Sequence, residues 1–181
     1  MPPVLTDGAL TLRRPSLADA EEHLAAEDDE MRLRFDSRGP ATLEGMRGAF
    51  QRWIDLWDAG GPNFTYLVRL AASHVLVAGC EIRFETAERA GVSYWTYAPF
   101  RRQGYAAQAM RLMIEAAART PGLGTLEARV APDNLASRAL ARSLGFVEIG
   151  EVEDTAWDGV VSTLIAHQRR ADHPAASRPA N

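Results

Sequence analysis

Hydrophobic and polar residues alternate in several short runs of this chain, which is the pattern of strands with one buried face. In residues 75–85, for example, Cys80, Ile82 and Phe84 share one face, and the charged residues between them share the other. Runs of this kind, some more continuously apolar, predict seven strands at residues 10–13, 64–70, 75–85, 91–97, 125–130, 146–152 and 160–166.

Other segments repeat their apolar residues every three or four positions, as amphipathic helices do. Phe50, Trp53, Ile54 and Trp57 form one such face. Four helices are predicted: from Ser16 into the acidic patch 27–30, from Thr42 to Gly60, from Gly104 to Arg119, and from Asn134 to Gly145. Residues 31–40 are predicted to form a loop.

The order of these elements predicts a mixed α/β domain: strand, two helices, three strands, helix, strand, helix, two strands. It does not fit a repeated βαβ sheet. A length of 181 residues suits a single domain. We expect this domain to span residues 8–167, and the residues 168–181, rich in proline, alanine and charge, to form a disordered tail.

Composition excludes some functions and leaves others. The net charge of −4 does not favour binding to nucleic acid or to an anionic membrane. Cys80 and the four histidines lack the spacing of metal ligands, so no metal is expected. No apolar run is long enough for a transmembrane helix, and the first residues lack a signal peptide. We therefore expect a cytoplasmic protein.

Residues 98–110, APFRRQGYAAQAM, stand where a strand is predicted to end and a helix to begin. They could form an ordinary solvated turn. They could also bind phosphate, because a helix N-terminus offers unpaired N–H groups and a partial positive charge. Gly104 and Ala106 would let a phosphate approach the backbone, and Arg101 and Arg102 would add positive charge.

A resemblance to a known family, carried by this segment and by a second motif further along the chain, favours phosphate binding. RRQGYA at 101–106 resembles the diphosphate-binding signature of the GNAT superfamily of N-acetyltransferases, and NLAS at 134–137 with LGF at 144–146 resembles its branch that modifies ribosomal-protein N-termini. The resemblance covers residues 8–167. It implies a mostly antiparallel sheet of about seven strands flanked by four helices, with acetyl-CoA as co-substrate. The implied cofactor-binding residues are Thr96, Tyr97, Arg101, Arg102, Gln103, Gly104, Tyr105, Ala106, Asn134 and Ser137.

The proton-transfer residues are less defined. Many superfamily members have a tyrosine acid where this chain has Ala141, so the resemblance points to Ser137 as the acid that protonates the leaving thiolate. Alternatively, the Ser137 hydroxyl could form only a hydrogen bond to the backbone or to the cofactor and take no part in proton transfer. Glu81 is the leading candidate for the base, with Glu85 and His74 as alternatives, although a strand carboxylate is often a solvated or ion-paired group.

The resemblance implies that the first two helices wall an acceptor pocket, with Phe35, Trp53 and Tyr94 as candidate substrate-binding residues. The acceptor would be a small amine or a protein N-terminus, and a homodimer remains open. A non-catalytic acyl-CoA-binding module is the alternative function, and a transferase for a longer acyl group is a third.

Overall fold

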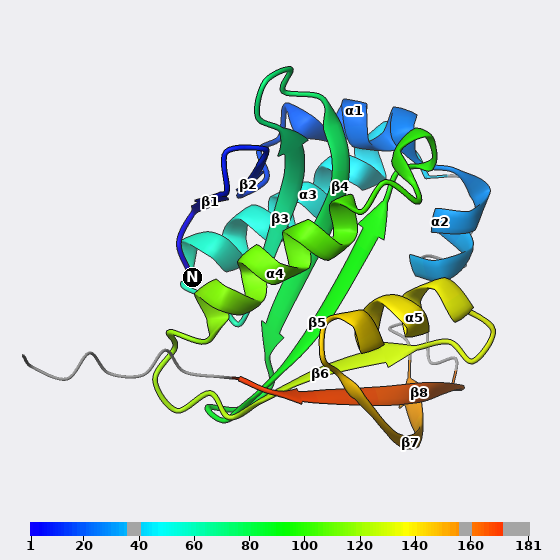
Figure 1. Ribbon diagram of the computed structural model, residues 1–181. Helices are drawn as coiled ribbons and strands as arrows, with labels where there is room; N and C mark the ends of the chain where they lie inside the picture. The colour runs from blue at the N-terminus through cyan, green and yellow to red at the C-terminus, as the bar shows by residue number, and fades with distance from the viewer. Residues whose placement is uncertain (36–40, 156–160, 172–181) are drawn as a thin grey trace, which may run out of the picture.

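The computed structural model describes residues 1–35, 41–155 and 161–171. Its middle layer is an eight-stranded sheet in the order β1-β2-β3-β4-β5-β6-β8-β7 (Figure 1). The strands are β1 Val4–Thr6, β2 Leu10–Arg13, β3 Asn63–Leu70, β4 Leu76–Phe84, β5 Arg89–Thr96, β6 Thr125–Val130, β7 Val147–Thr155 and β8 Val161–Arg170. All neighbouring pairs are antiparallel except β5 and β6.

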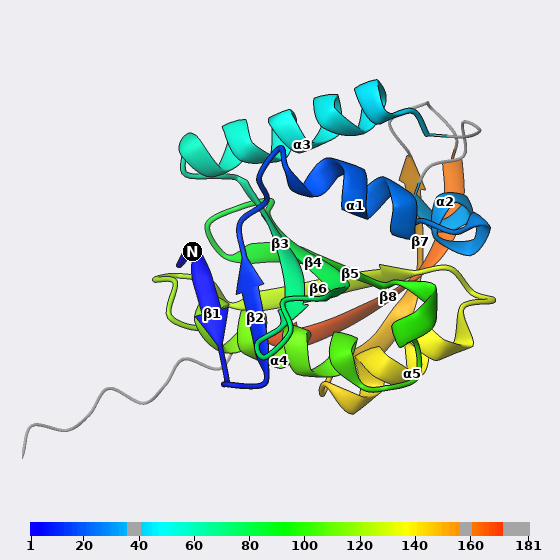
Figure 2. The ribbon, with the colours of Figure 1, turned by 90° about the horizontal axis from the view of Figure 1, so that it is seen from above.

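Helices cover both faces of the sheet. They are α1 Asp19–Ala26, α2 Asp29–Phe35, α3 Leu43–Asp58, α4 Tyr105–Ala117 and α5 Leu135–Ser143, with a short 3-10 turn at Ala98–Phe100. Figure 2 shows α1 and α3 on one face and α4 and α5 on the other, with α2 beside the end of the sheet. These are the α3 face and the α4 face below.

The apolar stripe of α4 anchors this helix to the sheet. Met110, Met113 and Ile114 are buried against β4 and its neighbours, and each such side chain contributes about 1.5–3 kcal/mol when fully buried. Ala106, in the first turn of the same helix, is only half-buried. The buried side chains therefore hold α4 in place, and its N-terminus lies at the edge of the core.

The strands β5 and β6 separate along their length. They pair in parallel from Arg89 opposite Thr125 to Gly91 opposite Glu127, and no further. Beyond that point β5 continues beside β4 through Thr96, while β6 continues beside β8 through Val130. In Figure 1 the two strands diverge from this point, which opens a gap in the sheet.

The predicted fold class is confirmed, with corrections to its elements. The described residues contain eight strands and five α-helices instead of seven and four, because β1 pairs with β2 and because α2 forms where a loop was predicted. The helix starts predicted at Thr42 and Asn134 are confirmed, and these two residues are the N-caps of α3 and α5. Strand β8 extends past residue 167, the predicted end of the domain, and pairs with β6 as far as Arg170.

Candidate active site

A cavity of about 690 Å³ occupies the gap between β5 and β6. Its walls come from the second half of β5, the end of β6, the first turns of α4 and α5, and one side of α2. Eight of the ten predicted cofactor-binding residues line it: Thr96, Arg101, Arg102, Gly104, Tyr105, Ala106, Asn134 and Ser137. The side chains of the other two lie elsewhere, as described below.

The first turn of α4 opens into this cavity. Gly104 is its N-cap and has a φ of 85°, which is a left-handed conformation that suits glycine. The first bond inside the helix runs from the Gln108 N–H to the Gly104 carbonyl, so the N–H groups of Tyr105, Ala106 and Ala107 have no partner within the helix. A Cβ at Gly104 would have no heavy atom within 4 Å, so the space beside this residue at the start of the helix is open.

The two arginines before Gly104 differ. Arg101 forms a bidentate ion pair with Asp28, at 2.6 and 2.8 Å, and contacts Glu30 at 3.0 Å. Its hydrogen bonds lower the pKa of Asp28. Arg102 is exposed at the cavity and forms no ion pair within the described residues. Only Arg102 is therefore available as a cation for phosphate without breaking an ion pair.

Gln103 was predicted to bind cofactor, but its side chain is turned away from the cavity. Its Nε2 donates a hydrogen bond to the Pro99 carbonyl at 2.9 Å and closes the turn before α4. The side chain therefore stabilises the loop locally, and only the backbone of Gln103 remains close to the helix start.

The first turn of α5 forms the opposite wall. The Oδ1 of Asn134 accepts a hydrogen bond from the Ser137 N–H at 3.1 Å, which leaves the Asn134 amide nitrogen outside this cap. The Ser137 carbonyl accepts a hydrogen bond from the Tyr94 hydroxyl at 3.0 Å. The Ser137 hydroxyl has no hydrogen-bond partner among the described residues. It is the hydroxyl at this wall that can reach a bound group.

Tyr94 therefore bridges β5 and α5 from the α4 face. Its pKa is raised by burial, so the phenol stays neutral. It was predicted as a substrate-binding residue of the acceptor pocket. The alternation along β5 puts Tyr94 on the α4 face and Trp95 on the α3 face, and both line the cavity.

Tyr97 was predicted to bind cofactor, but its side chain is fully buried among residues of the α3 face. Its backbone N–H donates to the Val77 carbonyl at 3.2 Å. Hydrogen-bonded residues alternate along an antiparallel strand. Trp95 must therefore also point its backbone groups toward β4, and Tyr94 and Thr96 must point theirs away from β4, into the gap.

Two of the other predicted residues, Trp53 and Glu81, lie on the α3 face. Trp53 stacks on Trp95, with ring centres 6.1 Å apart. Glu81 lies on β4 opposite Ser93 and accepts a hydrogen bond from Thr65 at 2.7 Å, but it does not line the cavity. Phe35 ends α2, and its side chain lies outside the described part of the structure.

The prediction of a loop at 31–40 hid the contribution of α2, whose Glu30, Met31 and Arg34 line the cavity. The helix is tied to both neighbouring loops, through Arg101 at one side and through a bidentate pair between Arg34 and Asp133 at the other. A signal was present in the sequence: Asp28 caps the Met31 N–H, and acidic residues precede basic ones along the helix.

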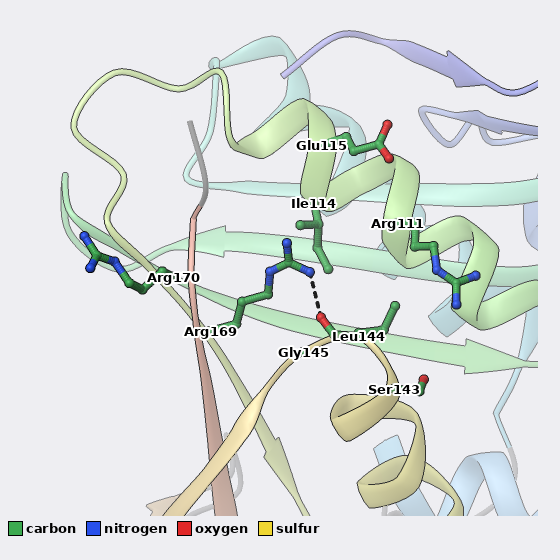
Figure 3. A pocket seen from close by; sticks show the side chains of 8 residues that line it. All are labelled: Arg111, Ile114, Glu115, Ser143, Leu144, Gly145, Arg169 and Arg170. Carbon is green, nitrogen blue, oxygen red and sulfur yellow. Dashed lines mark hydrogen bonds between the residues drawn. The ribbon is translucent and has the colours of Figure 1, made fainter. Parts of the chain in front are cut away.

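A second cavity, of about 560 Å³, lies between α4, the end of α5 and the end of β8 (Figure 3). Arg111, Arg169 and Arg170 line it. The Nη1 of Arg169 donates to the Leu144 carbonyl at 2.6 Å, which satisfies the C-terminus of α5. No sequence motif falls on this cavity.

The described residues contain no group of three potential metal-binding side chains. None of their helices is both long and apolar enough to cross a membrane.

A family model described as an acetyltransferase (GNAT) domain matches residues 9–147. This chain belongs to the GNAT acetyltransferase family. No curated protein matches the chain.

Solved structures share this GNAT fold. RimL, a ribosomal L7/L12 alpha-N-protein acetyltransferase, in complex with coenzyme A, has a TM-score of 0.82 and 18% identity, covering 94% of this chain and 99% of its own. The ribosomal-protein-S5-alanine acetyltransferase from Vibrio fischeri has a TM-score of 0.76 and 18% identity, covering 93% and 97%. MccE, in complex with acetyl-CoA and AMP, has a TM-score of 0.78 and 16% identity, covering 91% and 93%.

Proposed function

We propose that this protein is an acetyl-CoA-dependent N-acetyltransferase acting on a primary amine in a ternary complex. The observation that carries the proposal is the cavity between β5 and β6, where the first turns of two helices meet the backbone of a diverging strand. The amides of Tyr105, Ala106 and Ala107 would bind the diphosphate. The backbone groups of Tyr94 and Thr96 would pair with the pantetheine arm.

The proposed chemistry is direct attack. The amine nitrogen bonds to the thioester carbonyl carbon, and negative charge develops on the carbonyl oxygen. A backbone N–H of Tyr94 or Thr96 in the gap is suitably directed to stabilise this oxyanion. The C–S bond then breaks, and the departing thiolate takes a proton from the Ser137 hydroxyl or from solvent.

The amine must lose a proton to become acetylated, and Glu81 is the proposed acceptor of that proton. Glu81 does not line the cavity, so the proton would travel through a water or through the hydroxyl of Ser93, which lies opposite Glu81 and does line the cavity.

We propose a protein N-terminus as the acceptor. This is supported by the names of two similar structures, RimL and the Vibrio fischeri enzyme, which describe acetyltransferases of ribosomal proteins. A small amine is the alternative acceptor, and a cytoplasmic location remains a prediction.

The test is release of free thiol from acetyl-CoA in the presence of defined amines. We would compare short peptides with a free N-terminal serine or alanine with spermidine, and confirm the acetylated product by mass. Thiol release that requires the peptide supports the proposal. Binding of acetyl-CoA without turnover of any of these amines would instead favour the non-catalytic module.

A further inference from the structure

The side chain of Trp95 lies flat against the backbone of β4. The residue beneath it is Gly79, which is paired with Trp95 across the two strands. A Cβ at Gly79 would lie 2.0 Å from the indole Cζ2, 2.3 Å from Cε2 and 2.6 Å from Cη2. Any side chain at position 79 would therefore displace the ring, so this position of the indole requires glycine.

Two further side chains contact the indole from other directions, and a third is linked to it through one of them. Trp53 of α3 stacks on it at an interplanar angle of 25°. The ring of His23 meets the indole edge-on, with ring centres 5.9 Å apart. The Tyr97 hydroxyl is in turn 2.6 Å from the Nδ1 of His23.

The chain of buried polar groups continues beyond the histidine. The Nε2 of His23 lies 3.3 Å from the Oε1 of Glu27, and His23 is buried, with 4% of its surface exposed. Burying such polar groups is costly unless they are paired. A purely apolar set would fill the same core volume without that cost, so we attribute the polar chain to control of the indole position.

Trp95 is a wall of the cavity and is only half-buried, which distinguishes it from a core residue. Its side chain is on the α3 face, whereas α4 and α5, with their amide-bearing first turns, lie on the other face. If the cofactor enters from the α4 face, the acceptor reaches the thioester beside the indole.

We infer that Trp95 is the residue that positions the acceptor amine, and that Gly79, Trp53 and the Tyr97–His23–Glu27 chain hold its indole for that purpose. This inference rests on the proposed transferase function. Arg102 is the cation proposed for the phosphate, and the other charged residues that line the cavity are already paired: Glu30 with Arg101, Arg34 with Asp133, and Arg129 with Glu127. The wall therefore recognises an uncharged carbon segment next to the amine by apolar contact.

The experiment is Gly79→Ala, measured with acetyl-CoA and the peptide that the wild type acetylates fastest. We expect kcat/KM for the peptide to fall at least about tenfold, while the Kd for acetyl-CoA changes less than about twofold. Gly91→Ala is the matched control on the same face. There a Cβ would meet only the movable ends of Arg83 and Glu85, each at 3.3 Å, so we expect wild-type kinetics.

A double-mutant cycle tests whether the effect passes through the indole. In a Trp95→Ala background, adding Gly79→Ala should cause no further loss. Should Gly79→Ala fail to fold, Trp95→Phe carries the test, with the same expected fall for the peptide and the same retained Kd.

Unchanged peptide kinetics in Gly79→Ala, or in Trp95→Phe where that variant replaces it, would overturn the inference. An equal loss of acetyl-CoA affinity would also overturn it. So would a full additional loss of activity when Gly79→Ala is added to Trp95→Ala. Failure of the wild type to acetylate any amine would reject the proposed function instead, so the two failures are distinguishable.

Discussion

The two cavities of this protein differ in which ends of the helices they meet. The gap cavity faces the N-termini of α4 and α5, whereas the second cavity faces the C-terminus of α5 and the middle of α4. Both are lined by several arginines. Only the first combines them with unpaired backbone N–H groups, which carry the partial positive charge of a helix N-terminus.

The arginines themselves also serve different purposes. In the second cavity Arg169 bonds the Leu144 carbonyl at the negative end of a helix. In the gap cavity Arg101 is held by Asp28 and Glu30, and Arg102 is exposed. The comparison teaches that a count of arginines does not identify a phosphate site, because most of these guanidinium groups already satisfy carboxylates or carbonyls of the protein.

The largest expected effect concerns the chemistry in the gap cavity. Glu81→Gln keeps the side-chain shape and removes the charge, so kcat/KM at pH 7 should fall on the order of 10²-fold if Glu81 accepts the ammonium proton. The loss should shrink at high pH, where more of the amine is already deprotonated. A pH–rate profile with one peptide measures this. Parallel profiles of equal height would exclude Glu81.

The next effect concerns binding at the helix N-terminus. Gly104→Asp should weaken acetyl-CoA binding at least tenfold, or about 1.4 kcal/mol, because a carboxylate would face the diphosphate. Calorimetric titration measures the Kd. Gly8→Asp is the matched control, since Gly8 has nearly the same φ, 87°, and equally open space around it. Equal affinities of the folded Gly104 variant and the wild type would contradict phosphate binding at this turn.

Ser137→Ala separates two roles of one wall residue. If Ser137 protonates the thiolate, the substitution should lower kcat with little change in acetyl-CoA affinity. The loss should be only about tenfold, because a thiolate is already a tolerable leaving group. As a cofactor contact only, its loss should weaken affinity and spare kcat. Steady-state kinetics together with the Kd distinguish the two, and wild-type values for both would remove Ser137 from the site.

The smallest effect sharpens the comparison directly. Arg102→Ala should weaken acetyl-CoA binding about threefold, which is the size of an exposed charge interaction. Arg111→Ala removes an exposed arginine from the second cavity and should leave the Kd unchanged. Both dissociation constants should be measured at low salt, where screening is weak. A larger loss in the Arg111 variant would move the phosphate site to the second cavity.

Much of the site could be predicted because its parts are local in sequence. A glycine after a strand and before an alanine-rich helix predicts the turn at Gly104. The cap at Asn134 is equally local, because its side chain accepts a hydrogen bond from the Ser137 N–H only three residues away. Period-two alternation predicts which residues of β4 share a face. The helix α2 and the burial of the Tyr97 side chain could not be predicted in this way, because α2 is a short helix held by distant ion pairs and Tyr97 is buried by α1 and α3.

The sequence by itself thus determined most of the strands and longer helices, the caps at Thr42 and Asn134, and the helix start that faces the cavity, because each depends on backbone geometry within a few residues. Only the tertiary structure decided that β5 and β6 separate after Gly91, that Asp28 forms an ion pair with Arg101, 73 residues away in the sequence, and that the indole of Trp95 lies against Gly79. These features depend on strand register and on contacts between distant segments, which no local pattern encodes.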